Sequence, residues 1–99
     1  MEKHAKVVII GGGVVGCSIL YHLSKFGLKD CILLERNELT SGSSWHAAGN
    51  VHVISSDPNI SRMMAYTIGL YKEIEKESGH SVGFKPSGGF YLASNEVWA

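Results

Sequence analysis

The stretch that decides the fold reads Val7-Val8-Ile9-Ile10-Gly11-Gly12-Gly13-Val14-Val15-Gly16. Its four β-branched apolar residues predict a buried strand, and the spacing Gly-x-Gly-x-x-Gly begins directly after them at Gly11. A second apolar run, Ile32-Leu33-Leu34, leads to Glu35, which lies 19 positions after Gly16. Strand, glycine turn, helix, strand and acid in this order are the βαβ unit that binds an adenine dinucleotide. A glycine-rich turn that binds nothing is the alternative, and this context argues against it.

Each glycine of the motif has a separate physical role. Gly11 permits the tight turn, Gly13 lets the backbone approach a pyrophosphate, and Gly16 lets helix and strand pack closely. The pyrophosphate is expected on the free amides at the helix start, at Val14 and Val15, where the helix dipole is positive.

The acid at the end of the second strand indicates how the adenosine is recognised. Glu35 is expected to accept hydrogen bonds from the ribose hydroxyls. A carboxylate there also repels a 2′-phosphate, which argues against NADP. Arg36 could pair with such a phosphate, but the strand-end position belongs to Glu35, and we expect Arg36 to cover the adenine. The spacing alone does not separate FAD from NAD.

Composition narrows the functional classes. The chain has 99 residues, with 9 Lys plus Arg balancing 9 Asp plus Glu, so no basic surface indicates nucleic acid as a partner. The uncharged run from Val7 to Leu23 contains three consecutive glycines and precedes no cleavage site, which argues against a signal peptide or membrane span. No histidine or cysteine has metal-ligand spacing. A dinucleotide fold needs more strands than this length supplies, so we interpret the chain as the N-terminal piece of a longer enzyme.

Periodicity predicts the elements. We expect strands over residues 6–10 and 31–35, and a helix over residues 13–26 that ends with Gly27 as a left-handed cap. A second helix is expected from Asp57-Pro58 to Ser78-Gly79. Its predicted apolar face comprises Ile60, Met63, Met64, Thr67, Ile68, Tyr71 and Ile74.

The pattern changes after the second predicted helix. Val82 and Phe84 alternate with other residues, the turn sequence Pro86-Ser87-Gly88-Gly89 follows, and the alternation resumes at Phe90 and Leu92. This pattern predicts a β-hairpin that begins an antiparallel sheet.

The segment after Glu35 carries a resemblance to a known family. The run Glu38-Leu39-Thr40-Ser41-Gly42-Ser43-Ser44-Trp45-His46-Ala47-Ala48-Gly49 resembles the second FAD-contacting segment of the sarcosine and dimethylglycine dehydrogenases, FAD-dependent amine oxidoreductases of the D-amino-acid-oxidase-like group. The run Ser87-Gly88-Gly89-Phe90-Tyr91-Leu92-Ala93-Ser94-Asn95 looks closer to the sarcosine branch than to the dimethylglycine branch. The run Asn50-Val51-His52-Val53 departs from the usual family pattern, which leaves the substrate less defined.

The resemblance implies an α/β fold in two parts. Residues 1–79 would form the N-terminal βαβ part of a Rossmann-like, glutathione-reductase-like FAD-binding domain. Residues 80–99 would begin the antiparallel sheet of a substrate domain and be incomplete.

The resemblance also implies further cofactor contacts, at Thr40, Ser41, Gly42, Ser43, Ser44, Trp45, His46 and Ala47. In this family the histidine of the Trp-His pair carries the flavin covalently, whereas a lone loop histidine is more often a surface or hydrogen-bonding residue. Neutral imidazole is a suitable nucleophile near neutral pH. Trp45 is either a neighbour of the isoalloxazine or a core aromatic. The hydroxyls of Thr40, Ser43 and Ser44 suit phosphate and ribitol, with helix capping as their alternative role.

The function that the resemblance implies is oxidative demethylation of a small N-methylated amino acid such as sarcosine or dimethylglycine, by FAD acting on a CH–NH donor. Tetrahydrofolate in a further domain and an electron-transfer flavoprotein are implied as possible partners. No residue is assigned as catalytic base or substrate clamp, and the fragment alone is expected to be inactive. A non-catalytic regulatory relative and an NAD-dependent dehydrogenase are the alternatives. Localisation is expected to be cytoplasmic, or the mitochondrial matrix in a eukaryote, although no transit peptide is seen.

Overall fold

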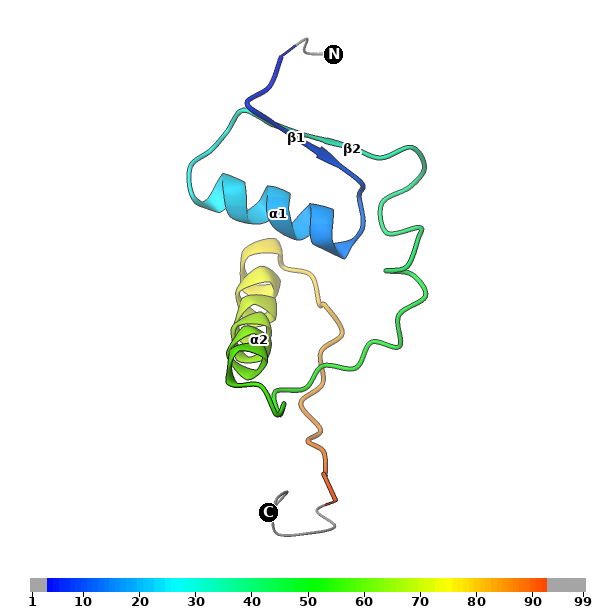
Figure 1. Cartoon of the computed structure of the whole chain (residues 1–99), viewed down its shortest axis with the longest axis vertical. Coiled ribbons are helices and arrows are strands. Elements are labelled where there is room, and N and C mark those ends of the chain that lie inside the picture. The colour runs from blue at the N-terminus through cyan, green and yellow to red at the C-terminus, as the bar shows by residue number, and fades with distance from the viewer. Residues whose placement is uncertain (1–3, 93–99) are drawn as a thin grey trace. The chain divides into compact units, whose positions relative to one another are not determined.

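The computed structural model describes residues 4–92, and the chain divides into two units, Met1–Gly49 and Asn50–Ala99. The first unit contains strand β1 (Val7–Ile10), helix α1 (Val14–Lys25) and strand β2 (Cys31–Leu34), and the second contains helix α2 (Pro58–Ser78). Figure 1 shows these elements along the chain.

The first unit is a βαβ motif. Strands β1 and β2 pair in parallel, with Val7 opposite Cys31 and Ile10 opposite Leu34. Helix α1 connects the two strands and contacts both of them (Figure 1). This arrangement confirms the predicted Rossmann-like start, with strands one residue shorter than expected because Lys6 and Glu35 lie just outside the ladder.

The core of this unit is centred on Ile9 in β1. Ile9 is 8% exposed, whereas its neighbours Val8 and Ile10 are 52% and 87% exposed. Alternating side chains of a strand point to opposite faces, so one face of the sheet carries the core. Gly16 in α1 is buried against this strand, and a Cβ built there would lie 3.4 Å from the Ile9 Cγ2 and overlap the Gly11 carbonyl oxygen. The absence of a side chain at Gly16 therefore sets the close approach of α1 to β1.

The C-terminus of α1 is closed by the predicted glycine. Gly27 has a φ of +92°, and its N–H donates to the Ser24 carbonyl at 3.0 Å. The Leu28 N–H donates to the Leu23 carbonyl at 2.9 Å. These two bonds form a Schellman motif, which satisfies carbonyls that the helix end leaves free.

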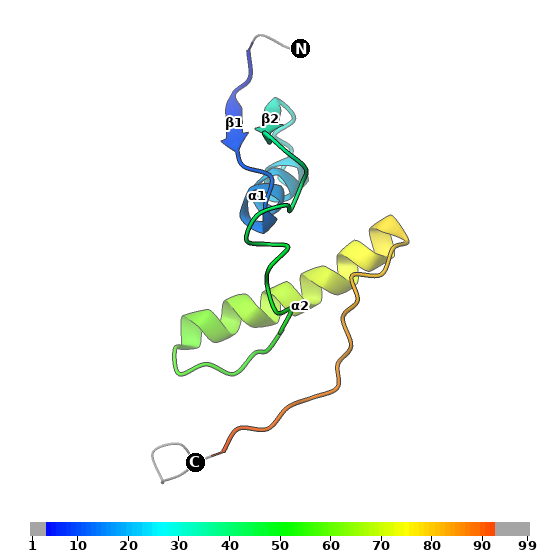
Figure 2. The same ribbon diagram turned by 90° about the vertical axis from the view of Figure 1, so that its right-hand side faces the viewer.

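Helix α2 has the predicted bounds, and both of its ends are capped. The Asp57 carboxylate accepts from the Asn59 N–H at 2.7 Å and the Ile60 N–H at 3.4 Å, Pro58 occupies the first turn, and Gly79 ends the helix with a φ of +71°. Figure 2 shows the length of this helix. Its predicted apolar face is half-buried at Met64, Thr67, Ile68, Tyr71 and Ile74 and exposed at Ile60 and Met63.

The predicted hairpin is absent from the part of the chain that the structure describes. Residues 80–92 contain no strand, and Phe90 is 100% exposed. The segment is held instead by a bond from the Val82 N–H to Glu75 Oε1 at 3.0 Å and one from the Tyr91 hydroxyl to the Ile54 carbonyl at 3.5 Å. A lone two-stranded hairpin is marginal in water, and no other antiparallel strand in residues 4–92 supports one.

The predicted boundary between residues 79 and 80 stays a prediction, and the last residues of the family-like run, 93–95, lie outside the described residues. Among residues 4–92, neither helix combines the length and the apolar character that crossing a bilayer requires.

The contact at Gly16 predicts a stability effect. Gly16→Ala in the full-length protein should lower the free energy of unfolding by about 2 kcal/mol, because the added methyl group meets backbone that cannot move aside. Gly69→Ala is the matched control, since a Cβ at Gly69 in α2 meets nothing within 4 Å. Urea unfolding of both variants measures the difference. Equal stability of the two would contradict the close packing of α1 on β1.

Candidate dinucleotide site

Three hydrogen bonds of the glycine-turn backbone join this turn to the end of β2 and to the loop that follows it. The Gly11 N–H donates to the Leu34 carbonyl at 2.8 Å, and the Gly12 N–H donates to Glu35 Oε2 at 2.8 Å. The Gly12 carbonyl accepts from the Thr40 N–H, also at 2.8 Å. Residue 12 therefore joins the glycine turn both to the acid and to the loop that follows β2.

Glu35 is held as an oriented anion. Its second oxygen, Oε1, accepts from the Asn37 N–H at 3.1 Å, and the side chain is half-buried. The N–H groups of Gly12 and then Asn37, helped by the nearby Arg36 charge, hold the pKa of the Glu35 carboxyl below its usual range. Each carboxylate oxygen accepts about two hydrogen bonds, so each keeps capacity for a ligand hydroxyl. A ribose hydroxyl is a donor that could use this capacity.

The N-terminus of α1 is open to an anion. Its first helical bond runs from the Cys17 N–H to the Gly13 carbonyl, so the amides of Val15 and Gly16 have no partner within the helix. Gly13 is the N-cap and supplies no side-chain cap, and the first turn contains no acidic residue. Amides that point outward from the positive end of a helix dipole suit a pyrophosphate.

Ser44 reaches this helix start from the loop. Its Oγ accepts from the Val14 N–H at 2.8 Å. A Cβ built at Gly13 would lie 3.2 Å from the same Oγ, which is closer than ordinary contact. The Ser44 hydroxyl still has its own proton, which it can donate to a phosphate oxygen. The capping role and the phosphate role expected of this serine are therefore compatible.

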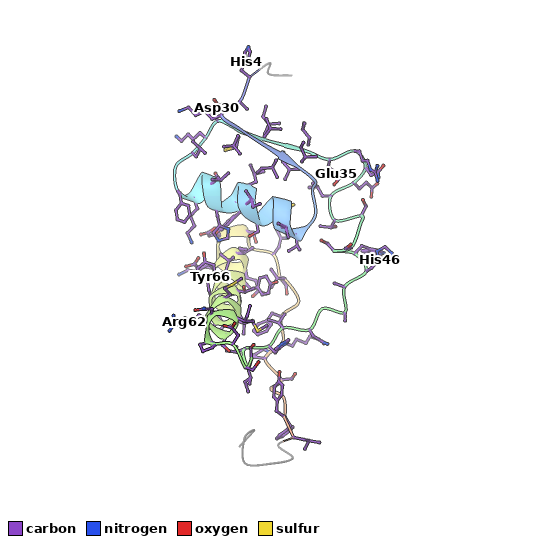
Figure 3. The ribbon with its side chains drawn as sticks, viewed as in Figure 1. His4, Asp30, Glu35, His46, Arg62 and Tyr66 are labelled. Carbon is purple, nitrogen blue, oxygen red and sulfur yellow. The ribbon has the colours of Figure 1, made fainter. Side chains whose placement is uncertain are left out.

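The loop after β2 is a series of tight turns. It enters them at Thr40, which has a φ of +64° and whose hydroxyl donates to the Leu39 carbonyl at 2.6 Å. The Trp45 N–H then donates to the Gly42 carbonyl at 3.2 Å, and the His46 N–H donates to the Ser43 carbonyl at 3.1 Å. Figure 3 shows Glu35 and His46 on this same stretch of chain.

The His46 ring is oriented by the backbone. Its Nδ1 lies 2.7 Å from the Gly42 carbonyl oxygen. Because a carbonyl only accepts, Nδ1 must carry the proton of the neutral ring, and Nε2 is left with the lone pair. Both His46 and its neighbour Trp45 are exposed, and Trp45 is 76% exposed. Trp45 is therefore not a core aromatic in this structure.

The structure brings some of the predicted residues together and leaves others apart. The glycine turn, Glu35, the Thr40 backbone and Ser44 meet around the start of α1. The remaining predicted contacts are exposed on the loop, namely Arg36, Ser41, Gly42, Ser43, Trp45, His46 and Ala47.

Sequence reasoning missed two contributions to this site. Gly12 was assigned no role, although three consecutive glycines were the available signal, and its missing side chain leaves room for Leu39 and Glu35. Asn37 contributes only its backbone N–H, for which no sequence signal exists. Within residues 4–92, no group of three or more His, Cys, Asp or Glu side chains lies together so that it could hold a metal ion.

The lowered pKa of Glu35 predicts a pH dependence. Its folded-state pKa lies below the unfolded value, so the stabilisation is present above the ordinary glutamate pKa of about 4.3 and is lost as the pH falls through the lower, folded value. Glu35→Gln should therefore lower the urea midpoint between about pH 6 and 8, and the gap to the wild type should close in acid. Glu38→Gln in the same loop is the control. A gap that persists unchanged in acid would show that the Glu35 charge has no part in it.

Comparisons with known proteins identify the family to which this sequence is similar. Residues 6–99 match the sequence model of the family described as FAD dependent oxidoreductase. The chain is 47% identical over 96 residues to the mitochondrial dimethylglycine dehydrogenase of Homo sapiens, across 97% of this chain and 11% of that protein. It is 42% identical over 96 residues to the human mitochondrial sarcosine dehydrogenase, across 96% and 10%.

A third relative is named as a regulatory subunit and not as an enzyme that oxidises an amine. The chain is 38% identical over 96 residues to the mitochondrial pyruvate dehydrogenase phosphatase regulatory subunit of Mus musculus, across 97% of this chain and 11% of that protein. The chain spans about one tenth of the length of these relatives. Identity is higher to the human dimethylglycine enzyme than to the human sarcosine enzyme, which does not support the closer likeness to the sarcosine branch expected from residues 87–95. The match across residues 6–99 places this chain in the FAD dependent oxidoreductase family.

Proposed function

We propose that the protein carrying this chain is an FAD-dependent dehydrogenase or oxidase that demethylates a small N-methylated amino acid such as sarcosine or dimethylglycine. The observation that carries the proposal is the junction of the glycine turn, Glu35 and the His46 loop within one βαβ unit. The substrate class rests on the names of the two human dehydrogenases that the chain resembles.

The described residues would divide the binding of FAD among the end of β2, the start of α1 and the loop after β2. Glu35 would accept from the adenosine ribose hydroxyls, and Arg36 would cover the adenine. The α1 amides and the Ser44 hydroxyl would hold the pyrophosphate, because both lie at the open N-terminus of the helix. The loop with Trp45 and His46 would then lie toward the isoalloxazine.

His46 would bind the flavin covalently through Nε2. This atom supplies the electron pair for a bond to the carbon of the activated ring methyl group. The new bond would replace a C–H bond of that methyl group, so the methyl proton and the Nδ1 proton of His46 would be released and the flavin would take up the two electrons. Dioxygen would then accept the two electrons and two protons as hydrogen peroxide. The bond would prevent loss of the cofactor.

The bound cofactor supplies the redox chemistry, and the chain positions it. The substrate would lose a hydride from its N-methyl carbon to the oxidised flavin and become an iminium. Water then adds and releases formaldehyde, a proton and the demethylated amine, or the one-carbon unit passes to tetrahydrofolate. Dioxygen or an electron-transfer flavoprotein would accept the two electrons. The base and the substrate contacts stay unassigned in residues 1–99.

Other roles remain as alternatives to this proposal. A regulatory, non-catalytic function has support from the likeness to the phosphatase regulatory subunit, and the Trp45-His46 pair argues against it. The family match argues against an NAD-dependent dehydrogenase. Cytoplasmic localisation stays a prediction, and the mitochondrial names of the human relatives favour the matrix alternative.

FAD binding through the glycine turn is tested by Gly13→Val. The branched side chain would crowd Ser44 and cover the amides at the start of α1, so the full-length variant should purify colourless. Gly69→Val in α2 should stay yellow, because a Cβ there meets nothing within 4 Å. Absorbance in the flavin bands relative to protein gives the stoichiometry. A Gly13→Val protein with one flavin per chain would refute the assignment of the cradle.

The covalent bond is tested by acid precipitation of the full-length holoprotein. Flavin should stay with the precipitated wild type, and mass spectrometry should place it on the peptide that contains His46. His46→Ala should bind FAD, because the cradle is intact, but release it on denaturation and oxidise the amine more slowly. His52→Ala is the matched control and should retain the bond. Complete release of flavin from the wild type would show that His46 forms no covalent bond, and it would not contradict FAD binding.

A further inference from the structure

The strained residue in this unit is Thr40. It is the only residue other than glycine with a positive φ among residues 4–92, at +64°. A β-branched side chain in the left-handed region is unfavourable, and such a conformation persists only where surrounding contacts hold it. Thr40 lies at the entrance to the loop that carries His46.

Two contacts attach this loop to the glycine turn. The first is the bond from the Thr40 N–H to the Gly12 carbonyl at 2.8 Å, and the second is the bond from the Val14 N–H to Ser44 Oγ at 2.8 Å. The left-handed turn at Thr40 lies at the first contact, and His46 lies two residues beyond the second. The partners of these two bonds, Gly12 and Val14, flank the start of α1. The direction that the chain takes at Thr40 therefore determines where the loop meets this part of the glycine turn.

The Thr40 hydroxyl is used within the backbone. It donates to the Leu39 carbonyl at 2.6 Å, so its single proton is not directed at a ligand in this structure. The contribution of Thr40 to the site is therefore made by its N–H group and its φ angle, and a residue without the hydroxyl can reproduce both.

We propose that Thr40 is a positioning residue for covalent attachment of the flavin: its left-handed backbone, fixed by the bond to Gly12, orients the loop that presents His46. The inference rests on the proposed function, because it concerns the rate at which His46 forms its bond. Thr40 acts through His46 and touches no reacting atom.

A series of substitutions at Thr40 separates the backbone from the hydroxyl. Gly and Asn adopt the left-handed conformation readily, so Thr40→Gly and Thr40→Asn should attach flavin at the wild-type rate. Thr40→Val keeps the shape of the side chain but loses the hydroxyl bond to the Leu39 carbonyl, and its β-branched side chain is strained at a positive φ. Thr40→Pro removes the N–H that bonds to Gly12 and fixes a negative φ. Both should attach flavin at least about tenfold more slowly, because small displacements of a reacting group cost that much or more.

The measurement uses full-length apoprotein, prepared under riboflavin limitation and mixed with FAD. Acid-precipitable flavin against time gives the attachment rate. Each Thr40 variant is also made with His46→Ala, and quenching of flavin fluorescence gives its non-covalent affinity, so that attachment rates are compared at FAD concentrations that saturate every variant. Thr67→Val in α2 is the matched control and should leave the rate unchanged.

The possible results distinguish a failure of the role of Thr40 from a failure of covalent flavin attachment itself. Slow attachment by Val and Pro at saturating FAD, with normal attachment by Gly and Asn, would support positioning. Equal slowing by Gly, Asn and Val would assign the effect to the hydroxyl and overturn the inference, as would slowing that disappears once FAD saturates the variant. Equal rates in all variants would also overturn it while leaving the covalent bond established. A wild type that attaches no flavin would overturn the covalent function, and the inference with it.

Discussion

The first unit depends on the hydrogen bond from the Gly12 N–H to Glu35 Oε2, 2.8 Å long. This bond connects residues 23 positions apart, and it draws the acid at the end of β2 onto the turn at the end of β1. The parallel pairing of the strands brings the two ends together, and the carboxylate fixes them there. A charged acceptor makes a stronger hydrogen bond than a neutral one, so this contact orients the acid before any ligand arrives.

Further features of the site depend on that junction. Because residue 12 also accepts from the Thr40 N–H, the loop after β2 starts from a fixed point and can return to the start of α1 through Ser44. The amides that would hold a pyrophosphate and the carboxylate that would hold a ribose are therefore set at neighbouring places on one turn. The imidazole of His46, oriented by the Gly42 carbonyl, is carried on the same loop. A cofactor that bridges these groups would bind to a site that is already formed.

The sequence predicts the local features of both units well and the contacts between segments less well. The left-handed cap at Gly27 and the helix start at Asp57-Pro58 follow from residue type and position, because each depends on backbone groups of its own helix. No strand forms over residues 80–92, the described part of the predicted hairpin, because alternation indicates only which side chains are apolar and a hairpin needs a further layer to pack against. The role of Gly12 and the strain at Thr40 arise from the way the loop closes on the turn, and neither has a signature in a single sequence.

The most direct test of the account measures the binding of FAD and of an FAD analogue that lacks the 2′-hydroxyl of the adenosine ribose. Full-length apoprotein with the His46→Ala change makes both affinities reversible and measurable by titration. If Glu35 receives that hydroxyl, the analogue should bind about tenfold or more weakly, as expected for a lost hydrogen bond to a charged group. In the variant that also carries Glu35→Ala, the two ligands should bind equally. An analogue penalty of the same size with and without the Glu35 carboxylate would contradict the account, because the ribose would then be bound elsewhere.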